Sequence, residues 1–187
     1  MVGEAPVTVT GTEYGDDVAN LQPGQYAGPC REAIHLPSYI SGYFDGEGCF
    51  TVSFSPRDKL KVGWETRPSV SVSQNRDRSE VISEIAGYFG CGTIRPDPSD
   101  HTVKWETRSL ADIRLRVPPH FDMYPLRSGK QRDVEIFREI CGRMADGWHI
   151  KVDGLRSIVE LAFRMNPSGS RRYDQQIMMN SLCKVKA

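Results

Sequence analysis

The chain has 187 residues, of which 39% are hydrophobic and 26% are charged, and its formal net charge is zero. That length suits one domain with a substantial core, and the absence of any run of about 18 apolar residues excludes a membrane span. A neutral chain argues mildly against nucleic acid as a partner, because nucleic-acid binders are usually basic. The charge is uneven, however. Residues 1–38 hold five acidic side chains and one basic, which leaves 23 basic and 19 acidic in the remainder, a net of +4.

Cysteine usage and the N-terminus both indicate an intracellular, non-secreted protein. The five cysteines are scattered and odd in number, and no two form a C-x-x-C pair, so we expect reduced thiols and no structural zinc. They are Cys30, Cys49, Cys91, Cys141 and Cys183. The polar, early-acidic N-terminus lacks the pattern of a signal peptide. A bacterial cytoplasm and an organelle both fit.

Residues 1–37 are rich in Gly, Pro, Thr and Asp and show little hydrophobic periodicity. This composition predicts an N-terminal extension, partly extended or disordered, with a possible short strand over residues 7–10. Residues 38–187 are expected to form one domain.

A short helix is predicted over residues 38–45, with Ser38 as its N-cap and two small residues, Ser41 and Gly42, that permit close approach of a second backbone. Asp45-Gly46-Glu47-Gly48 is expected to end it, because glycine tolerates the left-handed conformation common at helix ends. Glu47 would then lie just past the negative end of the helix dipole, where a bound cation would stabilise its carboxylate. The alternative is a glycine-rich turn with two solvated acids.

Strict alternation over residues 49–56 and 61–73 predicts an antiparallel hairpin, with Phe50, Val52, Phe54, Val62, Trp64, Val70 and Val72 facing inward. A helix capped by Ser79 follows over 79–89, then a second hairpin over 93–97 and 102–107 with Ile94, Val103 and Trp105 inward. We expect a short helix over 110–117 that ends at Pro118-Pro119, helices over 131–145 and 152–165, and a polar loop and frayed tail over 170–187. The order αββαββα predicts an α+β fold, one antiparallel sheet with helices packed on one face.

Four features together resemble the LAGLIDADG homing endonucleases. Ile40, Gly42, Asp45, Glu47 and Gly48 match that family's signature. Tyr-Phe-Gly-Cys-Gly-Thr-Ile at 88–94, Pro-Leu-x-x-x-Lys-Gln at 125–131 and Leu-Ala-Phe-Arg-Met-Asn at 161–166 extend the similarity over roughly residues 38–170. A single copy of the signature implies a homodimer that forms a DNA-binding saddle, with the paired helices meeting through Ile40, Ser41, Tyr43, Phe44 and Asp45.

The resemblance implies hydrolysis of double-stranded DNA at a long, near-palindromic target, as in intron homing. Mg²⁺ is the implied metal, with Mn²⁺ or Ca²⁺ able to replace it for binding, and neither a small-molecule cofactor nor a membrane is implied. The metal ligands would be Glu47 and the Gly46 carbonyl, one set from each subunit. The resemblance implies that Gln74 orients a water molecule and that the basic residue Lys130 stabilises negative charge at the phosphate. Arg78 is a further basic candidate. Asp45 is expected to be a cap or a supporting group.

The outward sheet residues become candidates for DNA contact, because a two-stranded ribbon fits the major groove. They are Thr51, Ser53, Ser55, Arg57, Lys61, Glu65, Arg67, Ser69, Ser71, Arg95, Asp97, Thr102 and Lys104. Without the resemblance, the same alternation is typical of an ordinary solvated sheet face. The alternative function is a non-cutting nucleic-acid binder on the same fold, either an intron RNA maturase or a DNA-binding regulator. An HNH nuclease is disfavoured, since the chain has four histidines and no metal-spaced cysteine pair.

Overall fold

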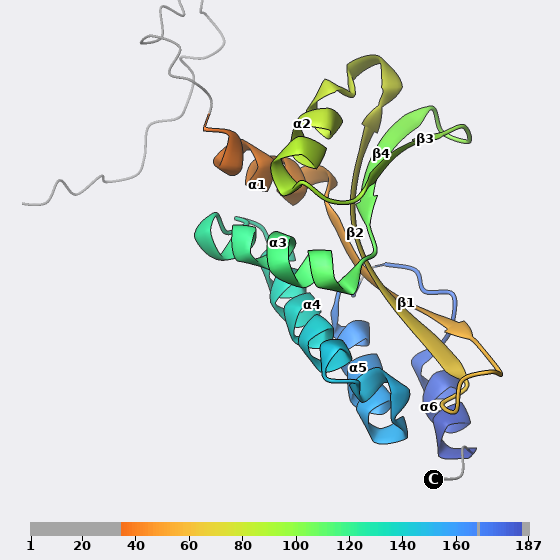
Figure 1. The fold of residues 1–187 in the computed structure, drawn as a ribbon. Helices are drawn as coiled ribbons and strands as arrows, with labels where there is room; N and C mark the ends of the chain where they lie inside the picture. The colour runs from red at the N-terminus through yellow and green to blue at the C-terminus, as the bar shows by residue number, and fades with distance from the viewer. Residues whose placement is uncertain (1–34, 168, 185–187) are drawn as a thin grey trace, which may run out of the picture. The chain divides into compact units, whose positions relative to one another are not determined.

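The computed structural model describes residues 35–167 and 169–184, so the predicted extension up to residue 34, its possible strand and Cys30 lie outside the described residues. Within the described part, the order of elements confirms the predicted α+β fold (Figure 1). The elements are α1 (Leu36–Glu47), β1 (Cys49–Pro56), β2 (Trp64–Asn75), η2 (Arg76–Arg78), α2 (Glu80–Phe89), β3 (Thr93–Asp97), β4 (Thr102–Thr107), α3 (Leu110–Met123), α4 (Lys130–Ala145), η3 (Trp148–Ile150), α5 (Val152–Arg164) and α6 (Gln175–Lys184). None of the described helices is long and apolar enough to cross a membrane.

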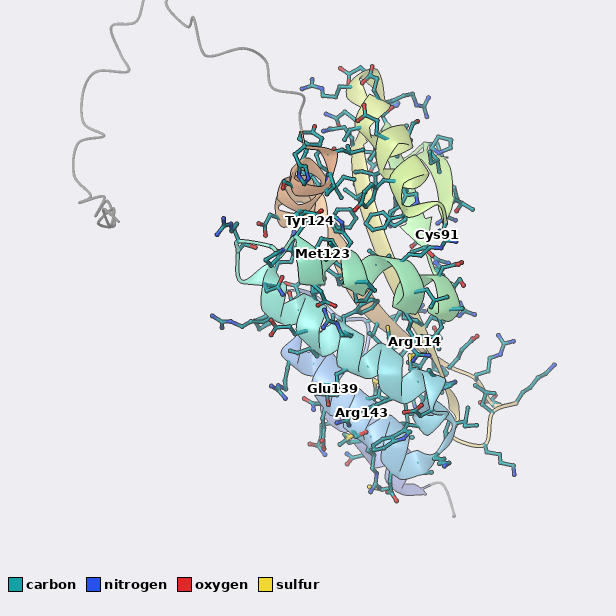
Figure 2. The ribbon with its side chains drawn as sticks, turned by 60° about the vertical axis from the view of Figure 1, so that its left-hand side comes forward. Cys91, Arg114, Met123, Tyr124, Glu139 and Arg143 are labelled. Carbon is teal, nitrogen blue, oxygen red and sulfur yellow. The ribbon has the colours of Figure 1, made fainter. Side chains whose placement is uncertain are left out.

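The four strands form one antiparallel sheet in the order β1-β2-β4-β3. Helices α1, α3 and α4 lie on one side of it (Figure 1). Alternate residues of β1 point toward these helices, as the sequence pattern predicted, and Phe50, Val52 and Phe54 are all buried. Figure 2 shows the solvated outer side of the helices, where Arg143 donates to Glu139 one turn earlier at 2.5 Å.

An aromatic cluster joins the sheet to the helices. The ring of Phe44 from α1 packs edge-on against Trp105 of β4 and Phe121 of α3, with ring centroids 6.2 and 5.3 Å apart. All three side chains are fully buried. The prediction for Ile94 is wrong, because this residue is 43% exposed. It lies on β3, a short strand at the sheet edge, where the helices give it little cover.

Helix α1 differs from the prediction at both ends. It begins at Leu36, since His35 rather than Ser38 is the N-cap, and Pro37 occupies the first turn, where a missing N–H costs nothing. It continues to Glu47. Gly48 follows with φ −71°, which any residue can adopt, so the left-handed conformation expected there is wrong. Gly48 is required by space instead, because a Cβ would lie 2.4 Å from Phe44 Cδ1 and 2.7 Å from the Phe44 carbonyl oxygen.

Helix α3 does not end at the two prolines. It runs through Pro118 and Pro119 to Met123, although each proline removes a backbone hydrogen bond. The residues around them explain the continuation, since Val117, Pro118 and Phe121 are all buried against the rest of the fold. Packing outweighs the local preference for a break.

The C-terminal prediction of a loop and frayed tail is wrong for residues 175–184, which form α6. Met178 and Leu182, one turn apart, are both fully buried. The carboxylate of Asp174 accepts from the backbone N–H of Gln176 at 2.7 Å and of Ile177 at 3.3 Å, which caps the helix start. The spacing of the two apolar residues after an aspartate was the signal for this helix.

Smaller differences concern strand and helix starts. Strand β2 begins at Trp64 rather than at residue 61, which leaves Lys61 in the turn before it, and continues to Asn75. The hydroxyl of Ser79 donates to the Arg76 carbonyl at 3.1 Å instead of capping α2. Helix α4 starts at Lys130, so this residue lies inside the helix rather than before it.

A buried histidine links three helices. His120 of α3 is 5% exposed; its Nε2 lies 3.0 Å from the Ser41 hydroxyl of α1 and its Nδ1 lies 2.9 Å from the Tyr88 hydroxyl of α2. Burial lowers the pKa of His120 to about 4. The imidazole is therefore neutral in the folded chain at pH 7.

We predict that His120 makes the fold sensitive to mild acid. In the unfolded chain its pKa is near 6.5, so between pH 6.5 and 4 the unfolded state binds more protons, and stability falls as the pH falls. The loss between pH 7 and pH 4.5 should be about 2 kcal/mol from this residue. Urea unfolding at both pH values measures it. His120→Gln should lower stability at pH 7 but show a smaller drop on acidification, and an equal drop in both proteins would contradict the assignment.

Candidate active site

The last residue of α1 presents a carboxylate to solvent. Glu47 is exposed, and it lies in the final turn of the helix rather than just beyond it. The carbonyl groups there make this the negative end of the helix dipole, which disfavours a lone anion. Within residues 35–167 and 169–184, no basic side chain forms an ion pair with Glu47. The carboxylate is thus available to a cation from outside the chain.

The ammonium group of Lys130 lies at the same helix end. Its Nζ donates to the carbonyl oxygens of Phe44 at 2.9 Å and Gly46 at 3.3 Å. The Phe44 carbonyl also accepts from the backbone N–H of Gly48 at 3.0 Å. The lysine thus adds a donor at the C-terminal end of α1 and places a positive charge beside the residue that precedes Glu47. The structure therefore brings together Lys130, Gly46 and Glu47, which the sequence had selected from segments 84 residues apart.

Asp45 fixes the loop that carries this lysine. Its carboxylate accepts from the backbone N–H groups of Arg127 at 2.6 Å and Ser128 at 3.2 Å, and from the Ser128 hydroxyl at 2.6 Å. The Ser128 oxygen in turn accepts from the Lys130 backbone N–H at 3.2 Å. Burial raises the pKa of Asp45, but the hydrogen bonds from Ser128 and Arg127 outweigh it, and the pKa lies below its ordinary value. Asp45 is a supporting group for the position of Lys130.

Gln74 is held against the same helix. Its side-chain amide donates to the Tyr43 hydroxyl at 2.9 Å, and its amide oxygen accepts from the Asn75 backbone N–H at 2.8 Å. Burial raises the pKa of Tyr43, the bond from Gln74 opposes this, and the negative charge of Glu47 adds to the rise. Tyr43, which sequence reasoning had not linked to Gln74, thus orients that amide in the neighbourhood of Glu47.

Arg78 is not joined to this group by any contact in the described residues. It lies in the η2 turn and pairs with its neighbour Asp77 at 3.5 Å, with both side chains at least 67% exposed. An exposed pair of this kind contributes little to rigidity.

The predicted outward residues of the sheet do share one face. Residues paired directly across antiparallel strands point to the same side. The register pairs Thr51 with Ser69, Ser53 with Arg67, Ser55 with Glu65, Arg95 with Lys104 and Asp97 with Thr102. Arg57 and Lys61 extend this set through the turn between β1 and β2, where both are exposed.

Ser71 is an exception. It lies on that face but is only 5% exposed, so the expectation of an accessible hydroxyl is wrong. The reason is its place in the middle of the sheet, between Cys49 on β1 and Glu106 on β4.

Glu106 is a residue whose importance the sequence did not reveal. Its side chain is 5% exposed and forms ion pairs with Arg95, with Arg108 at 3.1 Å and with Lys104 at 3.8 Å. Arg95 and Lys104 are direct cross-strand partners, and like charges in that position repel. The buried carboxylate offsets the repulsion and holds the cations in place. The sequence pattern did place Glu106 on the outward face of β4, opposite Thr93, which was the available signal that it lies on the same face as Arg95 and Lys104.

Comparison with known proteins identifies the family. Residues 40–141, more than half of the chain, match the sequence model of the family described as LAGLIDADG endonuclease. The chain belongs to the LAGLIDADG endonuclease family. Helix α1 carries its signature, and the family assignment predicted from the sequence is confirmed.

Relatives and solved structures agree with this assignment. "Probable intron-encoded endonuclease 2" of Neurospora crassa is 28% identical over 131 residues, which cover 70% of this chain and 29% of that protein. "Homing endonuclease I-ApeII" of Aeropyrum pernix is 31% identical over 106 residues, 56% of this chain and 62% of that protein. The chain thus corresponds to less than two thirds of the length of either relative.

Two solved structures share the fold over most of their length. The homing endonuclease I-TnaI superposes with a TM-score of 0.68 at 28% identity, covering 80% of this chain and 97% of that one. The archaeal intron-encoded homing endonuclease I-Vdi141I, solved in complex with DNA, superposes with a TM-score of 0.72 at 25% identity, covering 79% and 94%.

The residues predicted for contact between two LAGLIDADG helices need correction. Ile40 and Phe44 are fully buried in the chain's own core, and Ser41 is 6% exposed. The helix period turns this apolar side toward the sheet, and the Ser41 hydroxyl donates to the Tyr124 carbonyl at 2.6 Å. Tyr43 and Asp45 are half-buried with the partners described above. The exposed residues of the helix are Ser38, Tyr39, Gly42, Gly46 and Glu47.

The described residues of this LAGLIDADG protein supply a small set of metal donors around Glu47. Among the described residues, no three His, Cys, Asp or Glu side chains are grouped as metal ligands. Glu47 supplies a single hard oxygen ligand, and the Gly46 carbonyl already accepts from Lys130. Mg²⁺ is commonly held by one or two carboxylates together with water and phosphate oxygens, so this donor type fits that ion when further oxygens come from outside the chain.

Proposed function

We propose that the chain is a homing endonuclease that hydrolyses phosphodiester bonds of double-stranded DNA at a long, near-palindromic target. The observation that carries the proposal is the exposed carboxylate of Glu47, which forms no ion pair with any residue that the structure describes, next to the end of α1 that Lys130 contacts. Family membership and the DNA-bound I-Vdi141I structure support DNA as the substrate.

The proposed active form is a homodimer in which two α1 helices meet along Ser38, Tyr39, Gly42 and Gly46. Glycines on this side permit close approach, and the two Glu47 carboxylates would then converge near the two-fold axis. Together with DNA phosphate oxygens they would hold a divalent metal ion. Such an ion, when bound, supplies charge neutralisation at the phosphate and an acidified water.

The chain's own groups would position and stabilise the reacting atoms. The amide nitrogen of Gln74 has two hydrogens, and Tyr43 accepts one of them, so the other remains to orient a water molecule. The Lys130 ammonium, fixed by two carbonyls, would stabilise negative charge that develops on the phosphate. Because Asp45 and Ser128 hold the loop in advance, little reorganisation would accompany the reaction.

The polar sheet face would bind the major groove, with Ser, Thr, Arg and Lys side chains toward the base edges. The test is to incubate the protein and Mg²⁺ with DNA that carries the intronless insertion site of its host gene, and to map the ends. Cleavage at one site supports the proposal. Tight binding without cleavage favours a non-cutting binder.

Assembly can be tested at Gly42. A Cβ there meets nothing within 4 Å inside the chain, so Gly42→Leu should fold, but the larger side chain would hold two α1 helices apart. Sedimentation at micromolar concentration should show a dimer for the wild type and a monomer for this variant.

Gly87→Leu is the matched control, because Gly87 is also an exposed helical glycine with nothing within 4 Å. It should remain dimeric. A Gly42→Leu protein that sediments as the wild-type dimer would place the interface elsewhere.

A further inference from the structure

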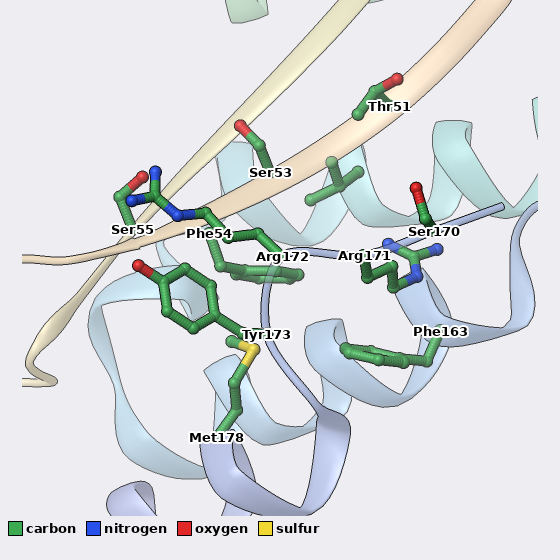
Figure 3. Close-up of a pocket in the computed structure, with 11 residues that line it drawn as sticks. Thr51, Ser53, Phe54, Ser55, Phe163, Ser170, Arg171, Arg172, Tyr173 and Met178 are labelled. Carbon is green, nitrogen blue, oxygen red and sulfur yellow. The ribbon is translucent and has the colours of Figure 1, made fainter.

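The segment between α5 and α6 lies along the free edge of β1, where residues of both faces of the strand line a shared cavity. Thr51, Ser53 and Ser55 line a cavity of about 240 Å³ together with Ser170, Arg171, Arg172 and Tyr173. Figure 3 shows the three hydroxyls along the strand, with the Arg172 side chain beside Ser55 and the Arg171 side chain beside Ser170. Since β1 is an edge strand, this segment extends the polar sheet face past the last strand.

The two arginines play different parts. Arg171 is anchored, since it donates to the carbonyls of Ala162 and of Met165, the latter at 2.9 Å, and its guanidinium lies 4.7 Å from the centroid of the Phe163 ring. Arg172 is exposed, with its guanidinium 5.5 Å from the centroid of the Tyr173 ring. A guanidinium stacked on a ring is restrained but keeps its N–H donors free in the plane.

These arginines differ from the others on this side of the sheet. Arg57 and Arg67 pair with Glu65, and Arg95 pairs with Glu106. In the part of the chain that the structure describes, no carboxylate forms an ion pair with Arg172. Arg171 likewise has none, and Asp133 acts on it only through its charge at longer range. Val52, Phe54, Phe163 and Met178 line the apolar side of this cavity, and its polar side offers guanidinium and hydroxyl donors. None of the described residues that line it is acidic, so the polar side suits the oxygens of a phosphate group.

We propose that Arg172, with the hydroxyl of Ser55 and with Arg171 as its anchored neighbour, forms a binding site for a backbone phosphate of duplex DNA. The proposal rests on the proposed function, because it assumes that DNA lies across the sheet face. Six residues separate Cys49 from Ser55, so the site lies roughly 20 Å along β1 from the Glu47 end. With one phosphate per about 3.4 Å of each strand, this corresponds to about six base pairs from the cleavage centre.

The test compares the affinities of the Arg172→Gln variant and the wild-type protein for a labelled DNA duplex, measured in EDTA. The duplex has about 30 base pairs, so it reaches the proposed site on both sides of the cleavage centre. The affinity should fall about tenfold, the effect of losing one hydrogen bond to a charged group. The slope of log affinity against log salt should become shallower by about one for each chain bound. Arg172→Lys, which keeps the charge, should retain the slope.

Arg114→Gln is the matched control, since Arg114 is an exposed arginine on the outer side of α3 (Figure 2) and loses the same charge. It should bind as the wild type does. On a duplex of about ten base pairs, too short to reach the site, Arg172→Gln and wild type should bind equally.

The outcomes separate the two proposals. Equal loss in Arg172→Gln and Arg114→Gln, or no loss in either, would overturn the phosphate site and leave DNA binding intact. A wild-type protein with no affinity for either duplex would overturn the proposed function and this site together. Thermal unfolding of Arg172→Gln should match the wild type, because Arg172 is exposed and forms no ion pair with the residues described in the structure.

Discussion

Glu47→Gln is expected to abolish DNA cleavage while leaving the fold and the dimer intact. The side chain is exposed and forms no ion pair in the described structure, so the substitution removes a charge without removing a contact. In the proposed dimer the substitution removes two negative charges that lie close together near the two-fold axis. Their mutual repulsion is then lost, so the affinity for polyanionic DNA should stay the same or rise. Turnover should fall at least about a hundredfold, since the metal would lose its anionic ligand in the transition state.

The measurement is cleavage of target DNA in Mg²⁺ beside binding of the same DNA in Ca²⁺. Glu84→Gln is the control, because Glu84 is an exposed glutamate on α2. It should cut and bind normally. A Glu47→Gln protein that cuts at the wild-type rate would mean that Glu47 is only a solvated turn residue.

Gly48→Ala is expected to cost about 3 kcal/mol of stability, as overpacking of a rigid site does. The backbone of Gly48 is in an ordinary extended conformation, so the cost comes from space alone. An added Cβ would lie 2.4 Å from Phe44 Cδ1 and 2.7 Å from the Phe44 carbonyl oxygen. That carbonyl accepts from Lys130, and the Phe44 ring is in the aromatic cluster, so neither can move freely.

Guanidinium unfolding of the purified variant measures this loss. Gly87→Ala is the control. It adds the same methyl group at an exposed helical position with nothing within 4 Å, where alanine raises helix stability by up to about 1 kcal/mol relative to glycine. If Gly48→Ala were as stable as the wild type, the tight junction between α1 and β1 would not hold in solution.

Local patterns predicted most of the elements. The alternation of Phe50, Val52 and Phe54 placed β1 and its buried face correctly, because a two-residue period has few interpretations. Helix α1 was harder, since Tyr39, Ile40, Tyr43 and Phe44 give an apolar run that does not indicate which side faces the core. The assignment of Ile40 and Phe44 to a dimer contact failed for that reason.

Contacts between distant segments could not be derived from local patterns. The bond from Lys130 to the Phe44 carbonyl joins residues 86 positions apart, and only the family resemblance placed Lys130 near the site. The cluster around Glu106 depends on strand register, and the place of Arg172 beside β1 depends on α6, which the sequence analysis missed. The continuation of α3 through Pro118 and Pro119 reflects packing that overrides a local preference.

The ion pairs on the sheet face explain how a chain of zero net charge can suit a polyanion. Glu65 and Glu106 act as built-in counterions for Arg57, Arg67 and Arg95, and occupy positions that dissolved anions would otherwise fill. Approach of DNA would then displace fewer small ions than the number of arginines suggests, which weakens indiscriminate electrostatic attraction. Each paired arginine would exchange its glutamate for DNA only where a base edge offers an equally good hydrogen-bond acceptor. A surface whose charges are already paired therefore favours sequence selectivity over general affinity for DNA.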